Sequence, residues 1–129
     1  MSQAEVSKLN VAVWFEIPAA DFARAKRFYE SVFGVRLADE RTGEHMLALF
    51  PHAGEAVSGC VMSGPGYAPS ANGPVVYINA GQDLAVPLSR VEAAGGKVAV
   101  PKTFLSEEIG YFAHFIDSEG NRIGMHSLH

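Results

Sequence analysis

VWFEIPAADFARAKRFYESVFGVRL, residues 13–37, has a counterpart in VVYINAGQDLAVPLSRVEAAGGKVA, residues 75–99. An offset of 62 residues pairs Asp21 with Asp83 and Gly34 with Gly96. Each stretch begins with an apolar segment, passes through a polar turn into a helical pattern, and reaches a second apolar segment after glycine. Similarity at a fixed spacing along one chain indicates an internal structural repeat.

The repeat continues beyond these two stretches. MLALFP at 46–51 resembles YFAHFI at 111–116, and EAVSGCVMSG at 55–64 matches EGNRIGMHSL at 119–128 with an offset of 64 residues. Each half is therefore predicted to form a βαβββ module. Strands and helices mixed in this order indicate an α+β fold.

The module boundaries follow from the loop composition between the halves. Residues 65–72 are rich in glycine, proline and serine, which is typical of a linker. We therefore predict one domain over 1–129, with a first module at 10–64 and a second at 73–128.

The helix of the first half has clear sequence signals. Its apolar residues share one helical stripe, namely Phe22, Ala25, Tyr29, Val32 and Phe33. Asp21 suits the N-cap and Gly34 suits the residue after the helix. In the second half Pro87 fits only a first helical turn, which predicts a later helix start than the repeat indicates. Four aromatic residues are expected on the helix-facing side of the sheets: Phe15, Phe28, Tyr29 and Tyr77.

Composition limits the class of protein. With 129 residues and 48% hydrophobic content, the chain can bury a core. The net charge of -4 argues against nucleic acid as a partner. Cys60 is the single cysteine, so no internal disulfide framework can form. No apolar run is long enough for a membrane span and the N-terminus is polar, so we expect a cytoplasmic protein without a membrane partner.

Three segments carry a resemblance to a known family. AADFARAKRFYESVFG at 19–34, RVEAAGGKV at 90–98 and GYFAHFIDSEGNRIG at 110–124 resemble the vicinal oxygen chelate superfamily. That superfamily includes glyoxalase I, extradiol dioxygenases, and the fosfomycin and bleomycin resistance proteins. The resemblance implies that each module curls its mixed sheet into a half-open cup. Two cups together form a ligand cavity, commonly across a homodimer.

The resemblance also implies where a metal would bind. Metal-using members take two ligands from each half, one on its first strand and one on its last. The matching positions here are Trp14 and Cys60 in the first half, and Val76 and Gly124 in the second. Three of these side chains cannot bind a metal, and a lone thiol does not make a centre. No cofactor is therefore predicted.

Strand alternation extends these four positions to a predicted cavity lining. Glu16 and His126 are the candidate catalytic residues, because a carboxylate and an imidazole in an apolar setting can move protons. The candidate ligand-binding residues share the same predicted face: Trp14, Cys60, Met62, Val76, Ile78, Arg122 and Gly124. A mostly apolar lining with a few polar groups is typical of a small-molecule pocket.

Several interpretations stay open from the sequence. Trp14 could stack on a ligand or pack in the core, and Cys60 could be a nucleophile or an inert buried thiol. His114 is expected to be a core or interface histidine.

Three functions fit this sequence. The first is a metal-independent small-molecule-binding protein, similar to the glyoxalase and bleomycin resistance branch. The second is a lyase, isomerase or dioxygenase with a divalent metal held by displaced ligands at Glu16, His126 and His114. The third is a non-catalytic interaction or regulatory module whose cup is filled by side chains.

Overall fold

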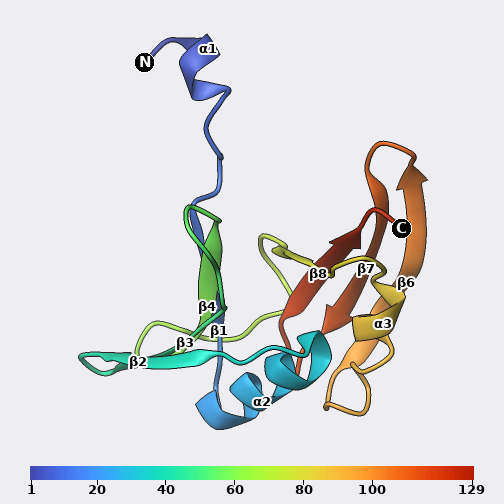
Figure 1. Cartoon of the computed structure of the whole chain (residues 1–129). Coiled ribbons are helices and arrows are strands. Elements are labelled where there is room, and N and C mark those ends of the chain that lie inside the picture. The colour runs from blue at the N-terminus through green and yellow to red at the C-terminus, as the bar shows by residue number, and fades with distance from the viewer.

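The chain folds into two four-stranded sheets, and each sheet is built from one half of the sequence (Figure 1). The computed structural model describes residues 1–129. Sheet A has the strand order β1-β4-β3-β2, and sheet B has the order β5-β8-β7-β6. In each sheet the first and last strands of the module are parallel and the other pairs are antiparallel. The predicted α+β fold with two βαβββ modules is confirmed.

The elements alternate along the chain as the repeat predicts. The first module contains β1 (Trp14–Pro18), α2 (Phe22–Phe33), β2 (Ala38–Thr42), β3 (His45–Leu49) and β4 (Ser58–Ser63). The second contains β5 (Tyr77–Asn79), α3 (Ala85–Leu88), β6 (Lys97–Ser106), β7 (Gly110–Ile116) and β8 (Arg122–Ser127). A four-residue helix, α1 (Gln3–Val6), precedes both modules.

The predicted ends of α2 are confirmed. The Asp21 side chain accepts a hydrogen bond from the backbone N–H of Arg24 at 3.0 Å. Gly34 has a φ of 65°, and its N–H donates to the Glu30 carbonyl. A residue without a Cβ adopts this left-handed conformation at no steric cost, so glycine ends the helix here.

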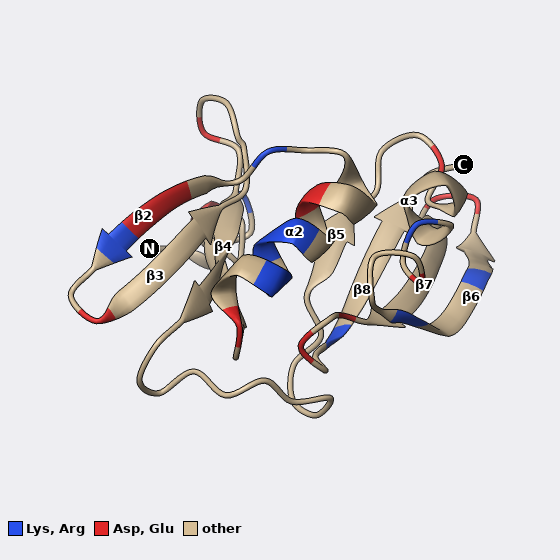
Figure 2. Ribbon diagram, turned by 90° about the horizontal axis from the view of Figure 1, so that it is seen from below, with Lys and Arg blue, Asp and Glu red and all other residues tan.

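Helix α2 lies between the two modules and packs against both. Figure 2 shows α2 at the centre, with β2–β4 on one side and β5–β8 on the other. The Phe28 ring centroid lies 5.7 Å from that of Phe115 on β7, and the Tyr29 centroid lies 5.7 Å from that of Phe50 beside β3. One buried apolar cluster therefore joins the first module to the second.

The turn that precedes β8 makes polar contacts with α2 and with the residues just before it. The buried Asp117 accepts a hydrogen bond from the Tyr29 hydroxyl at 2.6 Å. Glu119 accepts from the backbone N–H groups of Ala20 and Asp21 at 2.9 and 2.8 Å, and forms an ion pair with Arg24 at 2.6 Å. The second module thus supplies polar partners to a helix of the first.

The second helix differs from the first in length. Helix α3 spans only Ala85–Leu88, with Pro87 in its single turn, where a missing N–H costs no helical hydrogen bond. Turns follow, with the Arg90 N–H donating to the Pro87 carbonyl and the Val91 N–H to the Leu88 carbonyl.

The strand register departs from the sequence repeat by one residue. In sheet A, Glu16 lies opposite Cys60, whereas in sheet B, Tyr77 lies opposite Gly124. Tyr77 is therefore the structural counterpart of Glu16, although the sequence offset pairs Glu16 with Ile78. The prediction that Val76 and Ile78 share a face with Gly124 is therefore wrong.

The first residues extend away from both sheets. Residues 1–14 are exposed, and Figure 1 shows α1 and the following segment projecting beyond the body of the molecule. No helix of the chain has the length and hydropathy needed to cross a membrane.

Candidate functional site

Predicted site residues collect in three places. Two are the outer faces of the sheets, meaning the faces turned away from α2 and the shared core. The third is a groove between the modules. Sheet A presents Trp14, Glu16, Cys60 and Met62 on its outer face, because partners Glu16 and Cys60 share one side of the sheet and alternate residues follow them.

The Glu16 carboxylate is the polar centre of the outer face of sheet A. One of its oxygens accepts a hydrogen bond from the Tyr67 hydroxyl at 2.5 Å. The other lies 3.4 Å from the indole Nε1 of Trp14, which donates to it. Tyr67 belongs to the segment between the modules and had not been predicted as a partner of this carboxylate. Two aromatic side chains thus donate hydrogen bonds to the Glu16 carboxylate.

Cys60 lies beneath this pair and is fully buried. Burial, together with the nearby charge of Glu16, raises the pKa of its thiol to about 12. A thiol with that pKa is protonated at neutral pH and is a poor nucleophile. This supports the interpretation of Cys60 as an inert thiol.

Gly124 on the outer face of sheet B makes room for an aromatic ring. A Cβ at this position would lie 2.5 Å from Cδ2 of Tyr77, which is closer than atoms can approach. The Tyr77 ring consequently lies directly over the Gly124 backbone. The same close packing of a ring against a glycine occurs in sheet A at Gly59, where a Cβ would lie 2.4 Å from the Phe15 ring. Glycine within a strand marks such close approach.

His114 joins Tyr77 to Arg122 on this face. The Tyr77 hydroxyl oxygen lies 2.6 Å from His114 Nε2, and a guanidinium nitrogen of Arg122 lies 3.1 Å from His114 Nδ1. Burial of the ring and the Arg122 charge lower the pKa of His114. His114 was expected in the core or at an interface. Its half-buried ring lies on the outer face rather than in the core, hydrogen-bonded at both nitrogens.

His126 lies farther along the same face. Its Nε2 donates a hydrogen bond to the backbone carbonyl of Ile109. A pocket of about 370 Å³ opens beside it. The lining of this pocket is mostly apolar and consists of Tyr77, Leu105, Ile109, Phe112 and His126.

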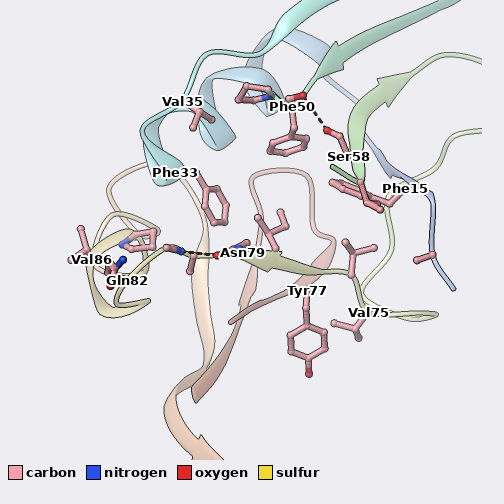
Figure 3. Close-up of a pocket in the computed structure, with 18 of the residues that line it drawn as sticks. Phe15, Phe33, Val35, Phe50, Ser58, Val75, Tyr77, Asn79, Gln82 and Val86 are labelled. Carbon is pink, nitrogen blue, oxygen red and sulfur yellow. Dashed lines mark hydrogen bonds between the residues drawn. The ribbon is translucent and has the colours of Figure 1, made fainter. Parts of the chain in front are cut away.

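A larger groove of about 1000 Å³ separates the two modules. Figure 3 shows the rings of Phe15, Phe33 and Phe50 on one side and β5 on the other. Val76 and Ile78 line this groove, and Ile78 also packs against the core. Their predicted place on the outer face with Gly124 is therefore wrong, because β5 pairs one residue out of step with the repeat.

The superfamily's metal positions do not fit a metal in this chain. The register places Glu16 beside Cys60 and Tyr77 beside Gly124, and Trp14 lies two residues before Glu16 on the same face of β1. An indole N–H and a glycine offer no donor atom to a metal ion, and Cys60 is held as a thiol. No three His, Cys, Asp or Glu side chains gather into a metal-binding group.

The displaced donors fit no better. Glu16 is on sheet A, whereas His114 and His126 are on sheet B, so a single copy of the chain does not bring the three side chains together. His114 Nδ1 faces the Arg122 guanidinium, which carries a positive charge where a metal ion would have to bind.

A family model supplies the classification of this chain. Residues 11–125 match the model described as the Glyoxalase/Bleomycin resistance protein/Dioxygenase superfamily. The chain belongs to this superfamily. The resemblance expected from the sequence is thus confirmed. A search of curated proteins gave no match.

Solved structures of the superfamily share the fold. A glyoxalase/bleomycin resistance protein from Streptomyces sp. CB03234 is 25% identical, with a TM-score of 0.67 over 88% of this chain and 97% of that chain. A protein of the same description from Albidiferax ferrireducens T118 is 18% identical, with a TM-score of 0.64 over 90% of this chain and 97% of that chain.

Glyoxalase I from Zea mays is a longer relative. It is 19% identical, with a TM-score of 0.66, and the match covers 90% of this chain but only 45% of that chain. This chain therefore spans a little under half the length of the maize enzyme. Identities this low show a shared fold and do not identify a substrate.

The sequence analysis assigned Tyr77 to the wrong place, because the repeat offset puts it in the core. No sequence pattern indicates the contact of Tyr67, in the loop between the modules, with Glu16. One signal could have found Tyr77: Gly124 is an isolated glycine in a strand, which indicates that another group approaches closely.

Proposed function

We propose that this protein binds a small organic molecule without the superfamily's usual metal, in a cavity that closes between two copies of the chain. One wall would be the outer face of sheet A of one copy, and the other wall would be the outer face of sheet B of its partner. The observation that carries the proposal is the pair of polar clusters, at Glu16 and at His114, each set among apolar side chains on the outer face of its sheet.

The edges of the sheets support the pairing of two copies. β1 and β5 are each the terminal strand of their sheet, so one side of each lacks a strand partner. Trp14 on β1 is 44% exposed and Tyr77 on β5 is 50% exposed. Unpaired strand edges and large exposed apolar groups are features of surfaces that associate. A homodimer would cover both edges and the groove between them.

The proposed cavity would suit a ligand that is apolar over most of its surface. Trp14 and Met62 would supply apolar walls, and Glu16, Arg122 and His126 would set the polarity. Burial of apolar area would provide most of the binding free energy, at roughly 25 cal/mol per Å² before the costs of association.

The other two functions have weaker support. The metal-dependent enzyme needs Glu16, His114 and His126 as ligands, and each of these side chains already has a hydrogen-bonding partner within the chain. The regulatory module needs a cup filled by side chains, whereas a groove of about 1000 Å³ and a pocket of about 370 Å³ lie open.

Elemental analysis tests the metal-free part of the proposal. The protein would be purified without chelators or affinity tags and incubated with manganese, iron, nickel and zinc in turn. We expect no stoichiometric metal after removal of the excess ion, because the superfamily positions offer no convergent set of donor atoms. A stoichiometric ion that Glu16→Gln or His126→Ala abolishes would overturn this part.

Light scattering coupled to size-exclusion chromatography tests the pairing. We expect a dimer, and we expect Val57→Glu to shift it towards monomer, because Val57 is 44% exposed and lines the groove. Leu128→Glu is the matched control, since Leu128 is 59% exposed but lies outside the groove. A monomeric wild-type protein that still binds small molecules would contradict the two-copy cavity.

A further inference from the structure

Three polar side chains on the outer face of sheet B, Tyr77, His114 and Arg122, can be hydrogen-bonded to one another in only one way. A guanidinium has N–H donors and no acceptor, so Arg122 must donate to His114 Nδ1 across 3.1 Å. Nδ1 therefore carries no hydrogen. A neutral imidazole carries one hydrogen, which must then be on Nε2. The lowered pKa of His114 agrees with a neutral ring.

This tautomer determines the direction of the next hydrogen bond. His114 Nε2 donates to the Tyr77 hydroxyl oxygen, which lies 2.6 Å away. The hydroxyl hydrogen of Tyr77 is consequently not used in this contact. No other polar group of the chain bonds the Tyr77 hydroxyl, so its hydrogen is free to be donated to a bound molecule.

The surroundings of Tyr77 fit an apolar molecule. Tyr77 borders the pocket of about 370 Å³, whose other walls include Leu105, Ile109 and Phe112. Gly124 beneath the ring fixes its position, since the ring lies against backbone. The ion pairs of the chain involve Arg24, Lys26 and Lys102, so Arg122 has no carboxylate partner competing with His114.

We propose that Tyr77 is a specificity residue that donates a hydrogen bond to an acceptor oxygen, carbonyl or carboxylate, on an apolar ligand in this pocket. Arg122 and His114 are positioning residues, because they set the direction in which the Tyr77 hydroxyl donates. This inference rests on the proposed small-molecule function and adds the chemical class of the group that is recognised.

Nitrogen-15 NMR tests the hydrogen bonds from Arg122 to His114 and from His114 to Tyr77 without any ligand. Long-range ¹H–¹⁵N spectra of the protein should show His114 as the Nε2–H tautomer from about pH 6 to pH 8. Arg122→Met should abolish this preference, because nothing then donates to Nδ1. A charged His114, or the Nδ1–H tautomer, in the wild-type protein would overturn the inference and leave the proposed binding function untouched.

Binding of three matched naphthalenes tests whether the Tyr77 hydroxyl donates a hydrogen bond to the ligand. The probes are 2-acetonaphthone, 2-naphthoate and 2-ethylnaphthalene, which carry a carbonyl, a carboxylate and no oxygen. We expect at least one oxygen-bearing probe to bind about fivefold more tightly than 2-ethylnaphthalene, as one net hydrogen bond allows. The stronger of the two oxygen-bearing probes would identify the preferred acceptor.

Two variants test whether Tyr77 causes the preference for the oxygen-bearing probes. Tyr77→Phe keeps the ring over Gly124 and should abolish the oxygen preference. Tyr111→Phe is the matched control, because Tyr111 is also on sheet B but packs against the core, and it should preserve the preference. Equal binding of all three probes, or a preference that survives in Tyr77→Phe, would overturn only this inference. Failure of every probe to bind would count against the inference and the proposed function together.

Discussion

Gly124 is a single residue on which the geometry of one sheet face depends. Gly124→Ala would place a Cβ 2.5 Å from the Tyr77 ring, so the ring must move and its hydrogen bond to His114 must break. We expect a loss of about 1–3 kcal/mol in the free energy of unfolding, as for other overpacked sites. Urea denaturation measures the loss, and the His114 NMR signals report the broken contact. An unchanged tautomer in this variant would show that Tyr77 is not held by close packing.

Cys60 illustrates how burial decides the chemistry of one side chain. With a pKa of about 12, only about one thiol in 10⁴ is ionised at pH 8. We expect a disulfide reagent such as dithionitrobenzoate to react with the folded protein at least a hundredfold more slowly than with protein unfolded in guanidinium. Equal rates in the two states would show that the thiol is accessible and ionisable.

At the scale of an element, the beginning of α2 depends on Glu119 from the other module. Its carboxylate accepts two backbone N–H bonds and pairs with Arg24. We expect Glu119→Ala to cost about 2–3 kcal/mol of unfolding free energy, because two backbone N–H groups lose a charged acceptor. Arg24→Gln should cost less than Glu119→Ala, since the Arg24 side chain is 49% exposed, its charge is screened, and Glu119 keeps its two backbone donors. Equal losses would contradict this ranking.

The same carboxylate predicts a pH dependence. Burial alone would raise the pKa of Glu119, but the hydrogen bonds from Arg24, the Asp21 backbone and Ser118 lower it overall. A lowered pKa in the folded state means that the stabilisation is full above the unfolded value of about 4.3 and is lost as pH falls through the folded pKa. Below pH 4, wild-type stability should therefore fall more steeply than that of Glu119→Ala. Parallel curves for the two proteins would show that Glu119 is not the titrating group.

At the scale of the whole molecule, one core makes the two modules interdependent. Phe28 on α2 is 1% exposed and contacts Phe115 of the second sheet. We expect Phe28→Ala to cost about 3–5 kcal/mol, as for other buried phenylalanines. We also expect a single unfolding transition in both proteins. Trp14 fluorescence reports the first module and far-ultraviolet circular dichroism reports both, so the two signals should coincide. Separate transitions would mean that the modules fold independently.

Local signals in the sequence determined the module pattern and the ends of the main helix. Asp21 caps α2 and Gly34 ends it because capping and left-handed backbone depend on the residue at that position and its nearest neighbours. The repeated order of strands and helix also came from short-range patterns. The outer face of sheet A followed in the same way, since Trp14 and Glu16 alternate along a five-residue strand.

Only the tertiary structure decided the face of β5 and the partners of the site residues. β5 has three residues, which is too short for alternation to fix which side faces the core. Its pairing with β8 sets the register, and that pairing brings Tyr77, rather than Val76, over Gly124. The contacts of Glu16 with Tyr67 and of Tyr77 with His114 join residues far apart in the chain. Such contacts depend on how the sheets and the linking segment fold together, and no local pattern encodes them.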